Sequence, residues 1–253
     1  MCIKKYKLNK KLQELKNIDL DVIVYAGQSN SMGFGIGNEE LSFSEDDDIL
    51  LYYKGKISKA CERKINNHDK RAILSLYFAK RYKEELLNEN HKILLIGAAV
   101  SGTGFSDHRW GIGEDLYNNL LFMTNKVLSE LPKAKLKCLL WHQGEADIEK
   151  GASIDYYHDK LRTLVEDYKN KTGCEDLPFI AGDYVPQWKE EEPYSFEIAK
   201  VTKEYVESVK NGGYVSSDGL EGNPKPDEIH FCRKSLKELG ERYFEKYKQI
   251  IRA

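Results

Sequence analysis

Short apolar runs alternate with longer amphipathic segments along this 253-residue chain. Six runs are predicted strands: residues 21–26, 49–53, 92–99, 136–141, 178–182 and 213–216. Most are apolar at consecutive positions, as in strands that are buried on both faces. The run at 49–53 has the weakest pattern, which indicates an edge strand or a short β-ribbon.

Helical patterns lie between and after the runs, at residues 69–88, 114–130, 153–172, 194–211 and 231–250. Ser153 is a plausible N-cap, and Gly173 suits the position after a helix end. Strand–helix alternation of this kind predicts an α/β fold, with a mainly parallel sheet covered by helices on both faces. Because neither a repeat nor a Pro/Gly/Ser-rich linker interrupts it, we expect one domain over residues 1–253.

Composition excludes several classes of protein. Apolar residues make up 41% of the chain, which is ample for a core, and the net charge of −2 gives no overall attraction to nucleic acid or to an anionic membrane. Five scattered cysteines form no CxxC pair, and the six histidines show no metal-ligand spacing. A disulfide framework and a metal site are therefore not expected.

The N-terminal residues 1–20 form a Lys-rich extension, which we expect to be a solvated face or a frayed tail. This segment lacks the apolar stretch of a signal peptide. The longest apolar run, residues 93–100, is too short to span a membrane. We therefore expect a cytoplasmic protein without membrane contact.

Polar segments follow four of the predicted strands. They are Gly27-Gln28-Ser29-Asn30, Ser101-Gly102-Thr103-Gly104, His142-Gln143-Gly144-Glu145 and Asp227-Glu228-Ile229-His230. In open α/β sheets, ligands bind beyond the carboxyl ends of the strands, so these segments should meet at one edge. Together they supply a hydroxyl, an imidazole, carboxylates and backbone N–H groups, the set that acyl transfer requires.

In this hypothesis Ser29 is the nucleophile, His230 takes its proton, and Asp227 holds the imidazole in the required tautomer. Candidate oxyanion donors are the backbone N–H groups of Ser29 and Gly102 and the side-chain amide of Gln143. His230 is expected at the start of the last helix, whose positive end should keep the imidazole neutral.

Each of these residues also has an ordinary structural explanation when it is taken alone. The glycines at 33, 35 and 37 raise the alternative of a nucleotide loop. The third comes one residue too early for GxGxxG, and no Walker lysine follows. Trp110 and Trp188 lie in polar loops, where they are either core residues or rings that stack on a sugar.

The motifs GQSN at 27–30, WHQGEAD at 141–147 and DEIHF at 227–231 resemble the SGNH-hydrolase superfamily. They are most similar to its branch of sialate O-acetylesterases and carbohydrate esterase family 6 (acetylxylan esterases). The resemblance runs from about residue 21 to 240. It implies a flavodoxin-like three-layer α/β/α sandwich, no metal or organic cofactor, and removal of O-acetyl groups from carbohydrates through a serine acyl-enzyme.

By motif position, the resemblance assigns the triad to Ser29, His230 and Asp227. Gly102 and Gln143 take the places of the oxyanion donors. Glu145 is either a buried structural anion or an auxiliary partner of His230. As the carboxylate of the triad, we rank Glu145 behind Asp227. Gln28, Asn30, Trp110 and Trp188 are predicted to contact substrate.

The sequence departs from the family pattern at two places. Ser31 is interposed between GQSN and Met32-Gly33, and the second block reads Ser101-Gly102-Thr103-Gly104-Phe105. Neither departure changes Ser29, Asp227 or His230.

From the motifs taken together we expect a serine esterase that acts on a small acetylated carbohydrate. The sequence does not specify the sugar. A lipid- or thioester-directed hydrolase and a non-catalytic carbohydrate-binding module remain alternatives. The sequence does not indicate an oligomeric state.

Overall fold

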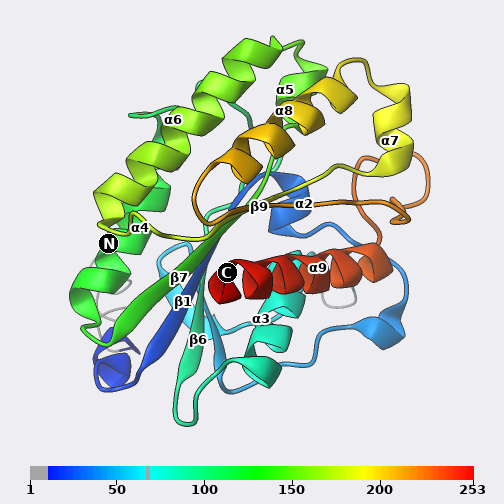
Figure 1. The fold of residues 1–253 in the computed structure, drawn as a ribbon. Helices are drawn as coiled ribbons and strands as arrows, with labels where there is room; N and C mark the ends of the chain where they lie inside the picture. The colour runs from blue at the N-terminus through cyan, green and yellow to red at the C-terminus, as the bar shows by residue number, and fades with distance from the viewer. Residues whose placement is uncertain (1–10, 67–68) are drawn as a thin grey trace.

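A seven-stranded sheet forms the centre of the computed structural model, which describes residues 11–66 and 69–253 (Figure 1). Its strands are β1 (Leu20–Gly27), β2 (Ile49–Tyr53), β3 (Lys56–Lys59), β6 (Lys92–Gly97), β7 (Ala134–His142), β8 (Phe179–Gly182) and β9 (Gly212–Val215). The order is β3-β2-β6-β1-β7-β8-β9, and only the β2–β3 pair is antiparallel. All eight residues of β1 are buried, which explains the apolar run over residues 22–26. The six predicted strands are confirmed.

The strand β2 is the edge ribbon that its weak pattern indicated. It pairs with β6 on one side and with β3 on the other through a two-residue turn. Lys54 and Gly55 both have positive φ, as a tight hairpin turn between twisted strands requires. The sequence patterns did not predict β3.

The helix expected over residues 69–88 is shorter in the structure. Residues Lys70–Arg71 form strand β5, which pairs with β4 (Arg63–Lys64), and the helix α3 begins only at Leu74. Ala72 N–H donates to Gly35 O at 2.9 Å, so tertiary pairing holds this segment extended. The predicted start was therefore wrong, because non-local hydrogen bonds outweigh helix propensity here.

Helices cover both faces of the sheet (Figure 1). The helices α3 (Leu74–Glu85) and α9 (Arg233–Arg252) lie on one face. The other face carries α4 (Asp115–Glu130), α6 (Ile154–Thr172) and α8 (Ser195–Ser208). Shorter helices occupy the connections: α2 (Ser29–Met32), α5 (Glu145–Glu149), α7 (Pro186–Glu191) and the 3₁₀ helix η1 (Glu39–Leu41). The predicted α/β/α arrangement is confirmed.

Local details of α6 follow the sequence. Ser153 Oγ accepts a hydrogen bond from Tyr156 N–H at 3.3 Å, and Gly173 ends the helix with φ of 67°. These are the expected N-cap and left-handed stop.

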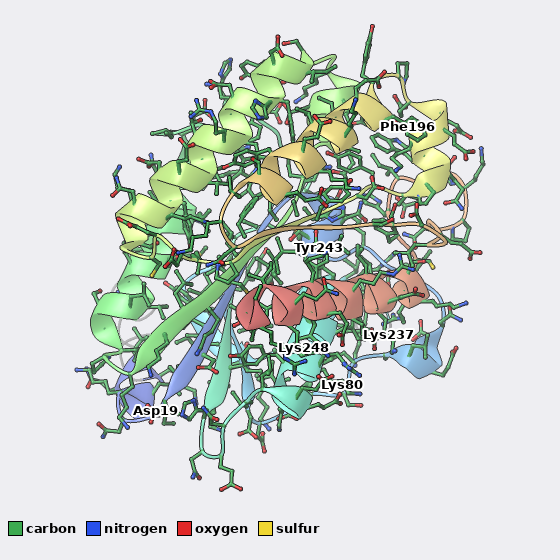
Figure 2. All side chains as sticks on the ribbon, in the orientation of Figure 1. Asp19, Lys80, Phe196, Lys237, Tyr243 and Lys248 are labelled. Atoms are coloured by element: carbon green, nitrogen blue, oxygen red, sulfur yellow. The ribbon has the colours of Figure 1, made fainter. Side chains whose placement is uncertain are left out.

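Side chains fill the space between the sheet and both helix layers (Figure 2). Tyr243 points from α9 toward the sheet, where its hydroxyl donates to Trp141 O at 2.9 Å, whereas Lys248 of the same helix pairs with Glu85. Residues 11–15 are helical, and Leu12 and Leu15 are buried in the same core. That part of the Lys-rich extension is therefore packed, and residues 1–10 lie outside the described part. No helix within the described ranges is long and apolar enough to cross a membrane.

Candidate active site

The proposed nucleophile lies at a sharp strand-to-helix turn. Ser29 begins α2, separated from β1 by Gln28 alone, and it is 2% exposed. Gly27 has φ of 113°, and a Cβ at this position would lie 2.1 Å from His142 O. Gln28 N–H donates to the same carbonyl at 2.9 Å. Only glycine therefore allows β1 to run so close to β7 before the chain turns into α2.

Asp227 lies against the imidazole of His230. Its Oδ1 is 2.5 Å from His230 Nδ1, and its Oδ2 accepts from Asn223 Nδ2 at 2.8 Å. Asn223 is 4% exposed, and it also donates to Phe34 O and accepts from Ile36 N–H. This asparagine fixes the carboxylate against the loop after α2. It was missed in the sequence because it belongs to none of the motifs.

An aromatic ring and a cation complete the surroundings of His230. Phe34 stacks on the imidazole, with ring centroids 4.4 Å apart and planes at 19°. The guanidinium of Arg63 lies 4.4 Å from the centroid of the Phe34 ring. Burial lowers the pKa of His230. The Asp227 carboxylate opposes this change, and the positive charges of Arg63 and Arg71 add to it.

The positive end of the last helix, which was expected to keep the imidazole of His230 neutral, is not the cause of this lowered pKa. The helix α9 begins at Arg233, three residues after His230, so the imidazole is not part of the first helical turn. Burial, the largest cause of the lowered pKa of His230, favours the neutral imidazole that a general base requires. Because Asp227 occupies Nδ1, the Nε2 atom is the one left for proton transfer.

Asn30 connects three of the sequence motifs. Its Nδ2 donates to Glu145 Oε1 at 2.8 Å and to Ile229 O at 3.0 Å, and its Oδ1 accepts from Phe231 N–H at 3.0 Å. The side chain therefore holds the peptide groups on both sides of His230. Asn30 is fully buried and bonded within the protein, which favours a positioning role, and its predicted contact with substrate stays a prediction.

Glu145 lies against a different histidine from the one in the predicted triad. Its Oε1 is 3.7 Å from His142 Nε2, whereas the carboxylate on His230 belongs to Asp227. Both Glu145 and His142 are enclosed in the core. Burial raises the pKa of Glu145 to about 7 and lowers the pKa of His142 to about 4.

Two glutamines of the motifs bond to each other. Gln143 Nε2 donates to Gln28 Oε1 at 3.4 Å and to Asp147 Oδ2 at 2.7 Å. Gln28 Oε1 also accepts from Ala146 N–H, so it caps the start of α5 from inside the protein. Gln28 Oε1 is thus bonded within the protein, and the predicted contact of Gln28 with substrate stays a prediction. For Gln143 to donate to an oxyanion, its amide would have to leave these acceptors.

Asp147 ties the loop after β6 to α5, and no role had been assigned to it. Its buried carboxylate accepts from Phe105 N–H at 2.9 Å and from Ser106 N–H at 2.7 Å. A Cβ on Gly104 would lie 2.4 Å from Asp147 Oδ2, so glycine is needed for this approach. The sequence contained the acid within WHQGEAD, but acid burial is not visible in a motif.

The predicted oxyanion glycine lies in the same loop. Gly102 is exposed and has φ of 67°, a conformation that favours glycine. Two residues earlier, Val100 N–H donates to Gly27 O at 3.0 Å. This bond places the loop beside the turn that carries Ser29.

Neither tryptophan is available to a sugar in this structure. Trp110 is completely buried, donates from Nε1 to Thr103 Oγ1 at 3.0 Å, and packs edge-to-face on Trp141. Trp188 is 5% exposed and packs on Tyr184. Of the two explanations for these rings, the core explanation fits. Among the described residues, no group of three His, Cys, Asp or Glu side chains has an arrangement that could hold a metal ion.

Comparison with known proteins identifies the family. The family described as "Carbohydrate esterase, sialic acid-specific acetylesterase" matches residues 19–249. The chain belongs to this carbohydrate esterase family. The match covers all four motif segments described above.

Two curated relatives of this esterase share parts of its sequence. The "Probable 9-O-acetyl-N-acetylneuraminic acid deacetylase" of Escherichia coli (strain K12) is 30% identical over 96 residues, which are 35% of this chain and 29% of the relative. The "Probable carbohydrate esterase At4g34215" of Arabidopsis thaliana is 25% identical over 119 residues, 45% of this chain and 44% of the relative. The aligned parts thus span less than half of each relative.

Solved structures resemble the esterase over most of its length. The crystal structure of NanS has a TM-score of 0.80 at 18% identity, covering 93% of this chain and 98% of that one. The structure of At4g34215 from Arabidopsis thaliana has a TM-score of 0.75 at 20% identity, covering 92% and 98%. At these identities the likeness establishes the fold, which is that of the SGNH hydrolases, as the motifs implied.

Proposed function

We propose that this carbohydrate esterase removes O-acetyl groups from small carbohydrates through an acetyl-enzyme on Ser29. The observation that carries the proposal is the Asn30 side chain. It bonds to the peptide groups before and after His230 and belongs to the helix that Ser29 begins. The base and the nucleophile are thereby joined through one buried amide.

In the proposed reaction, Ser29 Oγ attacks the acetyl carbonyl and His230 Nε2 takes the hydroxyl proton. The bond between the acetyl carbon and the sugar oxygen then breaks, and the imidazolium returns the proton to that oxygen. Water attacks the acetyl-Ser29 ester with the same base, which releases acetate and restores the hydroxyl. Asp227 stabilises the imidazolium in both halves.

The developing oxyanion needs hydrogen-bond donors that are already oriented. We assign the Ser29 N–H, because the first N–H groups of a helix have no partner inside it. The Gly102 N–H is the second assigned donor, since its loop is bonded to Gly27 through Val100. Gln143 is the third predicted donor, and the Discussion gives its test.

The proposed substrate is an acetylated sugar of the sialate or xylo-oligosaccharide type, in keeping with the names of the relatives. The proposed steps use no cofactor. Neither nucleic acid nor a membrane takes part in them, and a cytoplasmic location stays a prediction.

The test is acetate release from p-nitrophenyl acetate by the wild type and by Ser29→Ala. Ser31→Ala is the matched control, because Ser31 is also buried in α2 but its Oγ has no hydrogen-bond partner among the described residues. We expect the Ser29→Ala variant to lose the acyl-enzyme route and Ser31→Ala to retain it. Mass spectrometry after treatment with a fluorophosphonate should find one adduct, on Ser29. A folded wild type with neither hydrolysis nor adduct would overturn the proposal and leave sugar binding without turnover.

A further inference from the structure

The ring of Phe34 lies between the proposed base and a cation. The imidazole of His230 stacks on it with ring centroids 4.4 Å apart. The guanidinium of Arg63 also lies over this ring, 4.4 Å from its centroid. At these distances one face of the ring has no room for both groups, so they occupy opposite faces. A permanent positive charge is therefore one aromatic ring away from the imidazole.

The backbone that carries Phe34 is fixed by hydrogen bonds on both sides. Arg63 donates from Nη1 to Gly33 O at 3.1 Å, and Asn223 donates from Nδ2 to Phe34 O at 3.0 Å. Gly33 N–H in turn donates to Ser29 O at 2.9 Å, at the end of the helix that Ser29 begins. Arg63 thus touches the Phe34 ring and also holds the peptide that joins this ring to the nucleophile's helix.

Two contacts determine how the imidazole of His230 is oriented. Asp227 Oδ1 lies 2.5 Å from Nδ1 and fixes the direction of one edge of the ring. A single hydrogen bond still allows the imidazole to turn about the line between these two atoms. The Phe34 ring blocks that turn, because the two planes are nearly parallel, at 19°. Together the contacts direct Nε2, the atom that is proposed to take the Ser29 proton.

The positive charge of Arg63 has no acidic partner in an ion pair among the described residues. Its neighbour Arg71 pairs with Asp69 at 2.7 Å. Burial lowers the pKa of Arg63, whereas Tyr53 and Asp69 oppose this change. A guanidinium stays protonated in either case, so Arg63 keeps its full charge behind the Phe34 ring.

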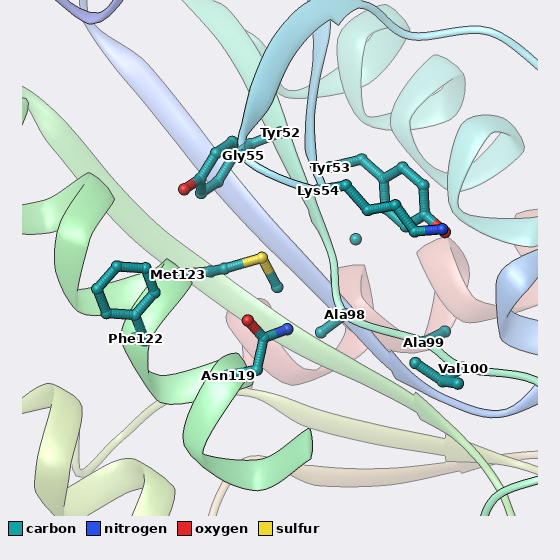
Figure 3. Close-up of a pocket in the computed structure, with 11 residues that line it drawn as sticks. Tyr52, Tyr53, Lys54, Gly55, Ala98, Ala99, Val100, Asn119, Phe122 and Met123 are labelled. Atoms are coloured by element: carbon teal, nitrogen blue, oxygen red, sulfur yellow. The ribbon is translucent and has the colours of Figure 1, made fainter. Parts of the chain in front are cut away.

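The β2–β3 hairpin borders the outer side of Arg63. Tyr53, Lys54 and Arg63 line one cavity of about 450 Å³. Figure 3 shows Tyr53 and Lys54 pointing to the same side of the hairpin, away from Asn119 and Met123. The hairpin side chains leave Arg63 half-buried, so that water screens its charge only in part.

We propose that Arg63, acting through Phe34, is a positioning residue for His230, because it fixes the ring on which the imidazole stacks and opposes protonation of the resting base. This inference rests on the proposed function, which makes His230 the base. Burial lowers the pKa of His230, Asp227 raises it, and the charges of Arg63 and Arg71 lower it further. Asp227 thus stabilises the imidazolium once it forms, whereas Arg63 keeps the imidazole neutral before the reaction.

The first experiment measures kcat/KM for p-nitrophenyl acetate against pH. Removing the positive charge in Arg63→Gln should move the acidic limb to higher pH by about 0.5–1 unit. Arg63→Met, a second neutral side chain of similar length, should give the same shift, and Arg63→Lys should restore the limb. Phe34→Leu removes the stacking plane and should lower kcat and kcat/KM alike by roughly tenfold.

Lys64→Gln is the matched control for loss of a positive charge. Lys64 is the next residue of β4 and is exposed, and successive side chains of a strand point to opposite faces. Its acidic limb should stay in place. An unchanged limb in the neutral Arg63 variants would overturn the proposal, as would a shift of equal size in Lys64→Gln.

The second experiment does not depend on ester hydrolysis. The pKa of His230 is measured by NMR titration of protein with labelled histidine, and the spectrum of His230→Asn identifies the signal. Arg63→Gln should raise this pKa by the amount that the acidic limb moves. The same rise in a protein that cleaves no ester would support the positioning role, and only the proposed function would fail. An unchanged pKa of His230 in an active esterase would overturn the positioning role and leave the proposed function intact.

Discussion

The buried side chains of Glu145 and His142 are predicted to make opposite contributions to the pH dependence of the free energy of unfolding. Burial raises the pKa of the carboxyl from 4.5 to about 7 and lowers the pKa of the imidazole from 6.5 to about 4. At about 1.36 kcal/mol per pKa unit, each displacement is worth roughly 3 kcal/mol. Between pH 4.5 and 6.5, unfolding releases a proton from Glu145 and takes one up at His142. The two contributions therefore cancel in the wild type.

The substitution Glu145→Gln separates the two groups. Glutamine keeps an oxygen for the bond from Asn30 but removes the titration of the carboxyl. The stabilising effect of a raised carboxyl pKa is present below pH 4.5 and is lost as the pH rises through 7. The free energy of unfolding of the variant minus that of the wild type should therefore increase by about 3 kcal/mol as the pH rises from 4 to 8. Its own stability should rise from pH 4 to 6.5, because His142 still titrates.

The assay is urea unfolding followed by tryptophan fluorescence at several pH values between 4 and 8, with equal m-values as the condition for comparison. Glu175→Gln is the control for the substitution itself, because Glu175 is exposed. A constant difference between Glu145→Gln and the wild type over this range would refute the reasoning. It would mean that Glu145 ionises in the folded protein as it does in the unfolded chain.

Three further substitutions test the positioning of the site. Asp147→Asn places an amide against backbone donors, so urea unfolding should show a loss of about 2–4 kcal/mol, and turnover of p-nitrophenyl acetate should fall about 10²-fold. Unchanged turnover would separate Asp147 from the site. Asp227→Asn should lower kcat by about 10⁴. Because Asp227 raises the pKa of His230, the acidic limb of the residual pH–rate profile should move to lower pH; a limb that stays in place contradicts the pairing. Gln143→Ala should lower kcat by about 10²–10³ if the amide turns to the oxyanion, and equal turnover would reject that role.

The sheet was predictable because strands buried on both faces leave continuous apolar runs, as in β1 and β6. The hairpin strand β3 and the β4–β5 pair were not. Their sequences are mostly polar. The strand β3 pairs with β2 across a two-residue turn, and a bond from the buried Arg233 to Lys70 O at 2.8 Å holds β5. Local patterns do not encode such contacts.

The proposed triad was predictable because its residues follow strands whose ends meet at one edge. The roles of Gln28 and Asn30 were not predictable from position alone. A polar side chain that caps a buried turn and one that contacts a ligand occur in the same kind of segment, and only the hydrogen-bond partners in the folded chain distinguish them. Asn223 and Arg63 were missed for the related reason that neither belongs to a motif: Asn223 lies in a loop, and Arg63 begins the short strand β4.

The hydrogen bonds of Asn30 also determine when the site can form during folding. They join residues 115, 199 and 201 positions apart in the chain. Closing such long loops is entropically costly, and contacts of this separation form after local ones. A refolding chain can therefore regain its helices, and the circular dichroism that reports them, before its nucleophile and base are brought together. Recovery of activity should lag behind recovery of secondary structure, so the Asn30 amide makes esterase activity a late reporter of complete folding.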